Sequence, residues 1–245
     1  MSIESLEQHA VPLRVARPAG PATTGVVVLH QAAGYSPQIE DWLLRLAGRG
    51  HLAVAPLLLH RHGVERVDPA ERFGGDLGAF AKFLPGDPEA LADFDAAADF
   101  LRAGGIEPKR TGVVGFSYGG RAAYLVAAEH ALGAAVTFYG NGIHAESFHG
   151  NDRLPALTDR VRDLRTPWLG LYGERDFLLA EGELDDWEQL LPAAPVPADL
   201  VRYPEAGHAF DVDTPFGPGG HSPYHPEATK DAIDRALGFL DQELS

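Results

Sequence analysis

Short apolar runs alternate with longer amphipathic segments along most of the chain, and this alternation limits the possible folds more than any other feature. We interpret six of the runs as parallel strands that are buried on both faces of a sheet. They are 25–29, 51–59, 111–116, 133–140, 166–173 and 198–204. The sequence therefore predicts an α/β fold, with a mostly parallel sheet and helices on both of its faces.

Helix signals lie between these runs. Ser36-Pro37 precedes an apolar stripe that ends at Gly48, and Asp87-Pro88 and Pro226 open two further helices. Two longer stretches, 60–88 and 141–165, are expected to be irregular and to lie over a site. Neither is long enough for a large cap domain. With 245 residues and 45% hydrophobic content, the chain is expected to form one domain over residues 1–245.

The charge and the missing cysteines exclude several partners. The formal net charge is −15, so we expect neither nucleic acid nor an anionic membrane as a partner. Without cysteine there is no disulfide, thiolate nucleophile or cysteine-based metal site. The first residues show no apolar signal core, and no apolar run approaches the roughly 20 residues that span a bilayer. A cytoplasmic protein, monomeric or homodimeric, is therefore expected.

The stretch "GVVGFSYGG", residues 112–120, places Ser117 between an apolar run and a helix-like segment. The pattern G-x-S-x-G should occur by chance only about 0.1 times in a chain of this composition. A nucleophile elbow requires a strand, a sharp turn that holds the serine, and a helix. Gly115 and Gly119 suit it, because side chains there would clash where strand and helix pack closely. We therefore interpret Ser117 as a nucleophile.

A serine hydroxyl needs a base and an acid, and at an elbow they follow in the order Ser, Asp, His. Asp176 follows the apolar run 166–173, and His208 follows the run 198–204. Ligand sites of open α/β sheets lie at the carboxyl ends of the strands, so both residues are in suitable places. The loop histidines lack either this order or this setting. They are His60, His62, His144, His149, His221 and His225.

The chain resembles the α/β-hydrolase superfamily and, within it, the dienelactone hydrolase family. The resemblance rests on "GFSYGG" around Ser117, "LYGERD" ending at Asp176, "EAGHAF" around His208, and the "FYG" that ends at Gly140. It implies the α/β-hydrolase fold and hydrolysis of an ester or lactone through an acyl-enzyme on Ser117. It also implies an oxyanion hole made by the backbone N–H of Tyr118 and by that of Gln31 or Ala32.

The chain departs from this family at the nucleophile and at the substrate contacts. The family typically has cysteine at the elbow with a nearby glutamate, where this chain has Ser117 and Gln31. The family also binds an anionic substrate through arginines, one of them shortly after the histidine. Here Asp211, Val212 and Asp213 follow instead. Arginines of the 60–88 loop remain candidates for such a contact, namely Arg61, Arg66 and Arg72. Of these, we predict Arg72 as the substrate-binding residue.

Tyr35 and Tyr118 flank the expected oxyanion hole and are candidates to line the acyl site. The histidine groups at 60–62 and at 144 and 149 lack metal-ligand spacing, so we expect neither a metal nor a cofactor. Two alternatives to a serine hydrolase remain. One is a non-catalytic protein that binds a small ligand on the same scaffold, and the other is an acyl transferase or perhydrolase that uses the same three residues.

Overall fold

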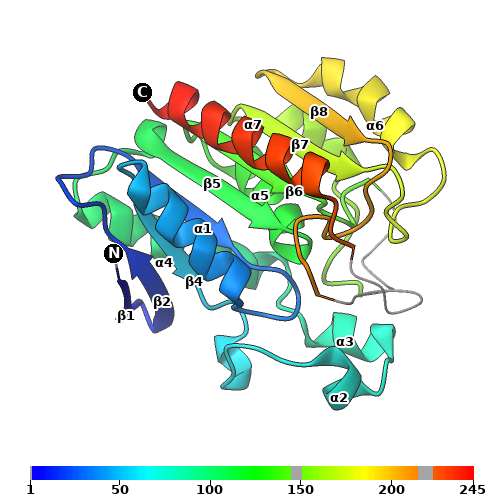
Figure 1. Ribbon diagram of the computed structural model, residues 1–245, viewed down its shortest axis with the longest axis horizontal. Coiled ribbons are helices and arrows are strands. Elements are labelled where there is room, and N and C mark those ends of the chain that lie inside the picture. The colour runs from blue at the N-terminus through cyan, green and yellow to red at the C-terminus, as the bar shows by residue number, and fades with distance from the viewer. Residues whose placement is uncertain (1, 145–150, 215–222) are drawn as a thin grey trace.

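The computed structural model describes residues 2–144, 151–214 and 223–245, and these residues form one eight-stranded sheet (Figure 1). The strands lie side by side in the order β1-β2-β4-β3-β5-β6-β7-β8. Their bounds are β1 Ile3–Gln8, β2 Val11–Ala16, β3 Gly25–Leu29, β4 Leu52–Pro56, β5 Thr111–Phe116, β6 Ala134–Phe138, β7 Trp168–Gly173 and β8 Ala198–Tyr203. All neighbours from β4 to β8 are parallel, whereas β2 is antiparallel to both β1 and β4. The predicted mostly parallel sheet is confirmed.

Helices cover both faces of this sheet, as predicted. They are α1 Pro37–Gly48, α2 Pro69–Phe73, α3 Leu77–Phe83, α4 Asp87–Ala103, α5 Tyr118–Glu129, α6 Glu183–Leu190 and α7 Pro226–Leu244. Helices α1 and α7 pack on one face, and α4, α5 and α6 pack on the other (Figure 1). Ser36 precedes α1, but its hydroxyl makes no capping hydrogen bond. None of the described helices has the length and apolar character needed to cross a bilayer.

Two hydrophobic cores explain why the central strands are apolar at every position. In β3, Val27 and Leu29 face the core under α4 and α5, while Val26 and Val28 face the core under α1 and α7. Alternate residues of a strand point to opposite faces, so both sets must be apolar. The prediction of a parallel strand is confirmed for β8, but that of burial on both faces is wrong, because β8 lies at the edge of the sheet and is only partly buried. The prediction of a strand is wrong for 57–59, because β4 ends at Pro56.

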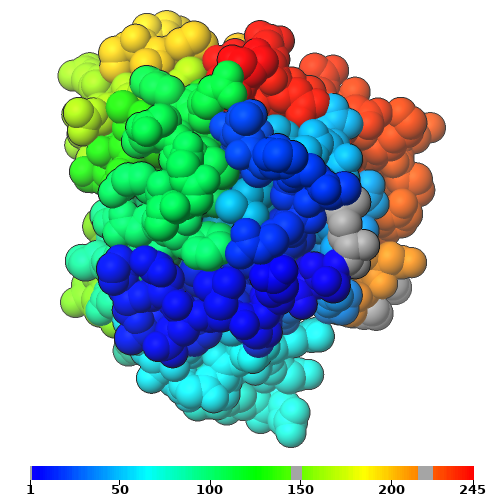
Figure 2. Space-filling model, turned by 90° about the vertical axis from the view of Figure 1, so that its left-hand side faces the viewer, coloured from blue at the N-terminus to red at the C-terminus, as the bar shows by residue number. Residues whose placement is uncertain are grey.

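The N-terminal hairpin of β1 and β2 was not predicted. Its turn consists of His9 and Ala10, which have φ angles of 51° and 63°. Turns of this kind usually carry Asn-Gly or Asp-Gly, and those residues are the sequence signal for such a hairpin. His-Ala gives no such signal, and β1 is largely exposed and polar. Figure 2 shows the hairpin in dark blue across one face of the molecule, above cyan residues of the 60–88 segment.

The prediction that the 60–88 segment is irregular is wrong. The segment contains the 3₁₀ turn η1 His60–His62 and the short helices α2 and α3. These helices project from the main body in Figure 1. The segment also forms backbone hydrogen bonds with the loop that follows β3. The amide of Tyr35 donates to the carbonyl of Glu65 at 2.8 Å, and the amide of Val67 donates to that of Ala33 at 2.9 Å. The prediction for 141–165 falls partly on residues 145–150, which lie outside the described residues.

Candidate active site

Ser117 lies in the turn between β5 and α5, in a strained backbone conformation. Its φ and ψ angles are 53° and −116°, a combination that a serine adopts only when its surroundings impose it. The neighbouring glycines make the turn possible. A Cβ on Gly115 would lie 1.9 Å from the carbonyl oxygen of Gly119, and one on Gly119 would lie 2.2 Å from that of Leu29. The expected close packing of strand, turn and helix is therefore present.

The structure brings Ser117, His208 and Asp176 together from three separate segments. Nε2 of His208 is 2.9 Å from Oγ of Ser117, and Nδ1 of His208 is 2.7 Å from Oδ2 of Asp176. The other oxygen of Asp176 accepts the backbone N–H of Leu178 at 2.9 Å. All three residues are buried, with exposed fractions of 7%, 3% and 5%. In this arrangement the ring can accept the hydroxyl proton while the carboxylate stabilises the charged ring.

Backbone amides flank the nucleophile on both sides of the turn. The amide of Tyr118 is the first of α5 and has no acceptor within the helix. On the other side, the loop after β3 packs directly on the elbow, since a Cβ on Gly119 would lie 2.5 Å from the carbonyl oxygen of His30. Among the described hydrogen bonds, none uses the amide of Gln31 or of Ala32 as a donor. Both amides suit the binding of a developing oxyanion.

His30 was not singled out in the sequence, and the structure places it beneath this loop. It is fully buried, with Nδ1 2.8 Å from the carbonyl oxygen of Gln31 and Nε2 3.0 Å from the amide nitrogen of Leu58. The amide can only donate, so Nε2 accepts and Nδ1 carries the proton. Burial lowers the pKa of His30 from 6.5 to about 4. A neutral ring thus fixes the backbone on which the predicted oxyanion hole depends.

We expect His30 to make the stability of the protein depend on pH between its folded and its unfolded pKa. Its folded pKa of about 4 lies below the ordinary 6.5, so its contribution is complete above pH 6.5 and decreases as the pH falls towards 4. Between pH 8 and pH 5 the loss amounts to about 2 kcal/mol. Urea unfolding of the wild type and of His30→Gln at both pH values measures it. The difference in unfolding free energy between the two proteins should shrink by that amount, and a difference independent of pH would contradict the neutral ring.

A hydrogen-bonded network of polar side chains lies beside His208. The ring centroids of Tyr139 and His208 are 5.0 Å apart, and the Tyr139 hydroxyl lies 2.5 Å from Oδ1 of Asp211. Nε2 of Gln38 donates to Oδ2 of Asp211 at 2.6 Å and to the Tyr139 hydroxyl at 3.0 Å. Gln31 donates from Nε2 to Oε1 of Gln38 at 2.8 Å. The network therefore joins the predicted oxyanion loop to the residues that follow His208, and no pattern in the sequence predicts this connection.

Burial shifts two pKa values in this network. It raises the pKa of Tyr139 well above 10, and the nearby carboxylate of Asp211 acts in the same direction. Burial also raises the pKa of Asp211 above 3.8, while the hydrogen bonds from Tyr139 and Gln38 act against this shift. Tyr139 is thus the protonated donor to Asp211. The φ angle of Tyr139 is 38°, a further strained backbone position beside the site.

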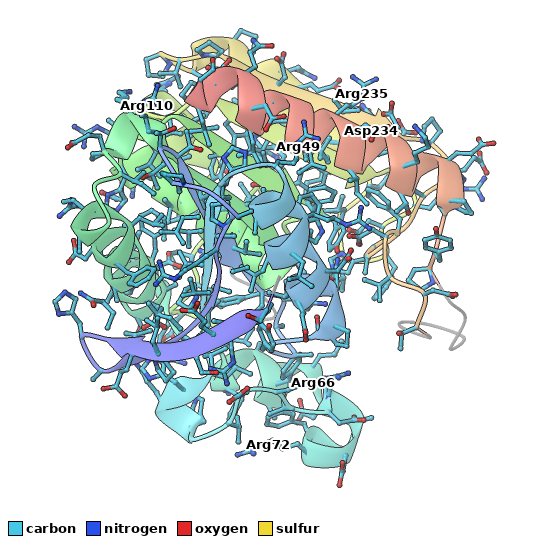
Figure 3. The ribbon with its side chains drawn as sticks, turned by 60° about the vertical axis from the view of Figure 1, so that its left-hand side comes forward. Arg49, Arg66, Arg72, Arg110, Asp234 and Arg235 are labelled. Atoms are coloured by element: carbon cyan, nitrogen blue, oxygen red, sulfur yellow. The ribbon has the colours of Figure 1, made fainter. Side chains whose placement is uncertain are left out.

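Three predicted substrate contacts lie in other surroundings. The ring of Tyr118 is buried in the core and its hydroxyl donates to the carbonyl of Pro85 at 2.8 Å, so its prediction as part of the acyl site is wrong. Tyr35 is partly buried, and the guanidinium of Arg14 lies over its ring. Arg72 is exposed on α2, at the bottom of Figure 3, with its guanidinium 4.7 Å from the ring centroid of Phe83. Among the described contacts, none joins Tyr35 or Arg72 to Ser117 or His208.

Three other arginines and histidines of the 60–88 segment have structural partners. Arg61 binds both carboxylate oxygens of the buried Asp93, and His60 lies 3.2 Å from the same side chain. Nε2 of His62 is 2.8 Å from the carbonyl oxygen of Phe83. Arg66 is exposed beside Arg72, where both line a surface hollow on α2. Within the described part of the chain, no three acidic or histidine side chains are grouped as metal ligands, and His149 lies outside it.

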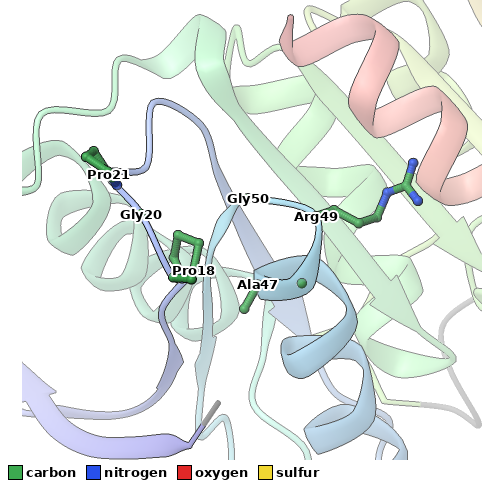
Figure 4. A pocket seen from close by; sticks show the side chains of 8 residues that line it. Pro18, Gly20, Pro21, Ala47, Arg49 and Gly50 are labelled. Carbon is green, nitrogen blue, oxygen red and sulfur yellow. The ribbon is translucent and has the colours of Figure 1, made fainter.

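A second surface hollow lies far from the nucleophile. It is formed by residues 18–21, after β2, and by residues 47–50, before β4 (Figure 4). These residues are at the amino end of β4, whereas Ser117, Asp176 and His208 follow the carboxyl ends of parallel strands. Ligand sites of open α/β sheets lie at the carboxyl ends, so the candidate active site is the one around Ser117.

The sheet, its two helical layers and the serine at the strand-to-helix turn define an α/β-hydrolase fold. The chain belongs to the dienelactone hydrolase family, whose model matches residues 11–244. A Yersinia pestis protein, provisionally named a carboxymethylenebutenolidase, is 33% identical over 95% of this chain and 84% of its own. A Rhodococcus opacus protein named carboxymethylenebutenolidase is 29% identical over 90% of this chain and 81% of its own.

A solved structure shows the same relationship. The crystal structure of a provisionally named dienelactone hydrolase from Klebsiella pneumoniae subsp. pneumoniae MGH 78578 superimposes with a TM-score of 0.82. It is 33% identical in sequence, and the match covers 98% of each chain. The resemblance deduced from the motifs is confirmed, and the chain is a hydrolase of this family.

Proposed function

We propose that this protein hydrolyses carboxylic esters or lactones through an acyl-enzyme on Ser117. The observation that carries the proposal is the pair of contacts made by His208, at 2.9 Å to Ser117 and 2.7 Å to Asp176. The names of the relatives support a lactone ring as one kind of substrate, because a butenolide is a cyclic ester; we do not extend the proposal to the carboxyl group that the same names denote. A serine in place of cysteine is compatible with this chemistry, since the histidine alone can take its proton.

The reaction proceeds in two acyl transfers. His208 takes the proton of Ser117 as Oγ attacks the carbonyl carbon, and the amides of Tyr118 and of Gln31 or Ala32 bind the oxyanion. The charged ring then gives its proton to the leaving oxygen, and the acyl-enzyme remains. Water next gives a proton to His208 and attacks the same carbon. The proton returns to Ser117 as the acid leaves, so the enzyme ends unchanged.

A fluorophosphonate tests whether Ser117 is activated, because such a probe phosphonylates a serine whose proton a base can remove. Trypsin should release residues 111–121, and Ser117 is the one serine in this peptide. We expect mass spectrometry to locate one adduct there in the wild type and none in Ser117→Ala. A wild type left unlabelled by excess probe would contradict the proposal and favour a protein that only binds its ligand.

A further inference from the structure

We propose that Asp211 makes the active site select uncharged and cationic esters over esters that carry a carboxylate. This inference rests on the proposed function, because it names the class of substrate for the same site. Asp211 lies three residues after His208, and one phenol ring, that of Tyr139, separates its carboxylate from the imidazole. A negative charge at this place acts on any charged group that binds near Ser117.

The hydrogen bonds around Asp211 fit an ionised carboxylate. Oδ1 accepts from the Tyr139 hydroxyl and Oδ2 accepts from the Gln38 amide, so each oxygen has a donor. The described ion pairs of the chain include none between Asp211 and a lysine or arginine. Its charge is thus stabilised by neutral donors, which leave its field uncancelled. A partly buried charge of this kind is screened less by solvent than an exposed one.

The same carboxylate determines the orientation of the side-chain amides of Gln38 and Gln31, which connect it to the oxyanion loop. Because Asp211 can only accept, Gln38 must turn its NH₂ group towards it and its Oε1 towards Gln31. Gln31 therefore uses its own NH₂ group on Gln38, and its Oε1 is buried without a hydrogen-bond partner among the described residues. This side of the site offers acceptors. Acceptors suit substrate N–H and O–H groups and repel a carboxylate.

The nearby arginines do not supply a compensating charge. Arg175 precedes Asp176 in the chain, but it is exposed and paired with Glu205. Arg61 is held by Asp93, and Arg121 is buried between α4 and α5, where it binds Asp87. Arg72 lies over Phe83 on the outer segment. Besides Asp176, whose carboxylate is bonded to Nδ1 of His208, the charge that a carboxylate-bearing ester would meet near this ring is that of Asp211.

Three aryl acetates test this selection, because they share the acetyl group and differ in the charge of the substituent on the phenol that leaves. They are the acetates of 4-hydroxybenzoate, of 4-hydroxybenzamide and of 4-(trimethylammonio)phenol. Asp211→Asn keeps the shape and one acceptor oxygen but removes the charge. We expect it to raise kcat/KM for the anionic ester relative to the neutral one by about 3- to 10-fold, and to lower that for the cationic ester by a similar factor. Comparing variant with wild type cancels the intrinsic reactivities of the esters.

Asp213→Asn is the matched control, because Asp213 is exposed and lies two residues further along. Removal of the Asp213 charge should leave the kcat/KM of the anionic ester and that of the cationic ester, each relative to the neutral ester, within about twofold of the wild-type ratios. The reason is that solvent and salt screen a charge at the surface. Unchanged ratios in Asp211→Asn would overturn the proposal. If that variant does not fold, Asp211→Ser, which also removes the charge, replaces it in the same comparison, and unchanged ratios in that variant would overturn the proposal.

The proposed function and the charge selection fail in different ways. Hydrolysis of the neutral acetate that requires Ser117, together with ratios insensitive to Asp211, rejects the selection alone. Absence of any Ser117-dependent hydrolysis rejects the proposed function, and the selection with it.

Discussion

Ser117→Ala should lower kcat for aryl esters by about 10⁵-fold or more, to the level of the residual catalysis that oxyanion binding supplies by itself. The methyl group removes the atom that forms the acyl bond, and neither His208 nor Asp176 can replace it. Steady-state kinetics with 4-nitrophenyl acetate measure the change. The fold should persist, because Ser117 makes its turn through backbone bonds, one of them from its amide to the carbonyl of Phe138 at 3.0 Å.

Ser5→Ala is the matched control for this loss, since Ser5 is exposed on β1 at the far edge of the sheet. It should retain wild-type kcat. Circular dichroism and the melting temperature should be unchanged in both variants, which separates lost chemistry from lost structure. Turnover by Ser117→Ala within tenfold of the wild type would show that another group carries the reaction, and the acyl-enzyme on Ser117 would be excluded.

The parts of the fold that could be predicted are the strands that are buried on both faces, because burial there requires an apolar residue at every position. Strands β3 and β5 are covered on both faces, so their sequences are apolar throughout and can be recognised. The hairpin of β1 and β2 is partly exposed, and there the polar residues hide the strands, whereas the edge strand β8 was recognised but is not buried on both faces as expected. The short helices of the 60–88 segment were missed for a related reason, since helices of five and seven residues contain too few turns to show a period.

The candidate site divides in the same way. Ser117, Asp176 and His208 could be singled out from the sequence because the chain order and the strand ends are set by the topology of the fold. The network of Gln38, Tyr139 and Asp211 joins residues 72 to 173 positions apart, and of the three only Tyr139 lies in a motif, the "FYG" that ends at Gly140. Its contacts depend on how side chains pack after the sheet has formed. Asp211 was noted only as a departure from the arginine that the family resemblance implies, and its partners required the structure.

Asp176→Asn should have the second largest effect, a loss of about 10⁴-fold in kcat, through the tautomer of His208. Oδ1 of Asp176 accepts the amide of Leu178, and Oδ2 faces Nδ1 of His208. In the variant, the amide of Leu178 holds the asparagine oxygen on its side, so the NH₂ group faces the ring. Nδ1 must then accept, and the proton moves to Nε2. A ring protonated at Nε2 cannot take the proton of Ser117.

The ¹⁵N chemical shifts of His208 distinguish this cause from a simple loss of charge. We expect a protonated Nδ1 in the wild type and a protonated Nε2 in Asp176→Asn, with the melting temperature close to that of the wild type. Asp199→Asn, which changes an exposed aspartate on β8, is the control and should keep full activity. A large loss of kcat without a change of tautomer would assign the effect of Asp176 to its charge. Near-normal activity in Asp176→Asn would remove Asp176 from the mechanism, because the reaction would then not need the bond between Asp176 and Nδ1 of His208.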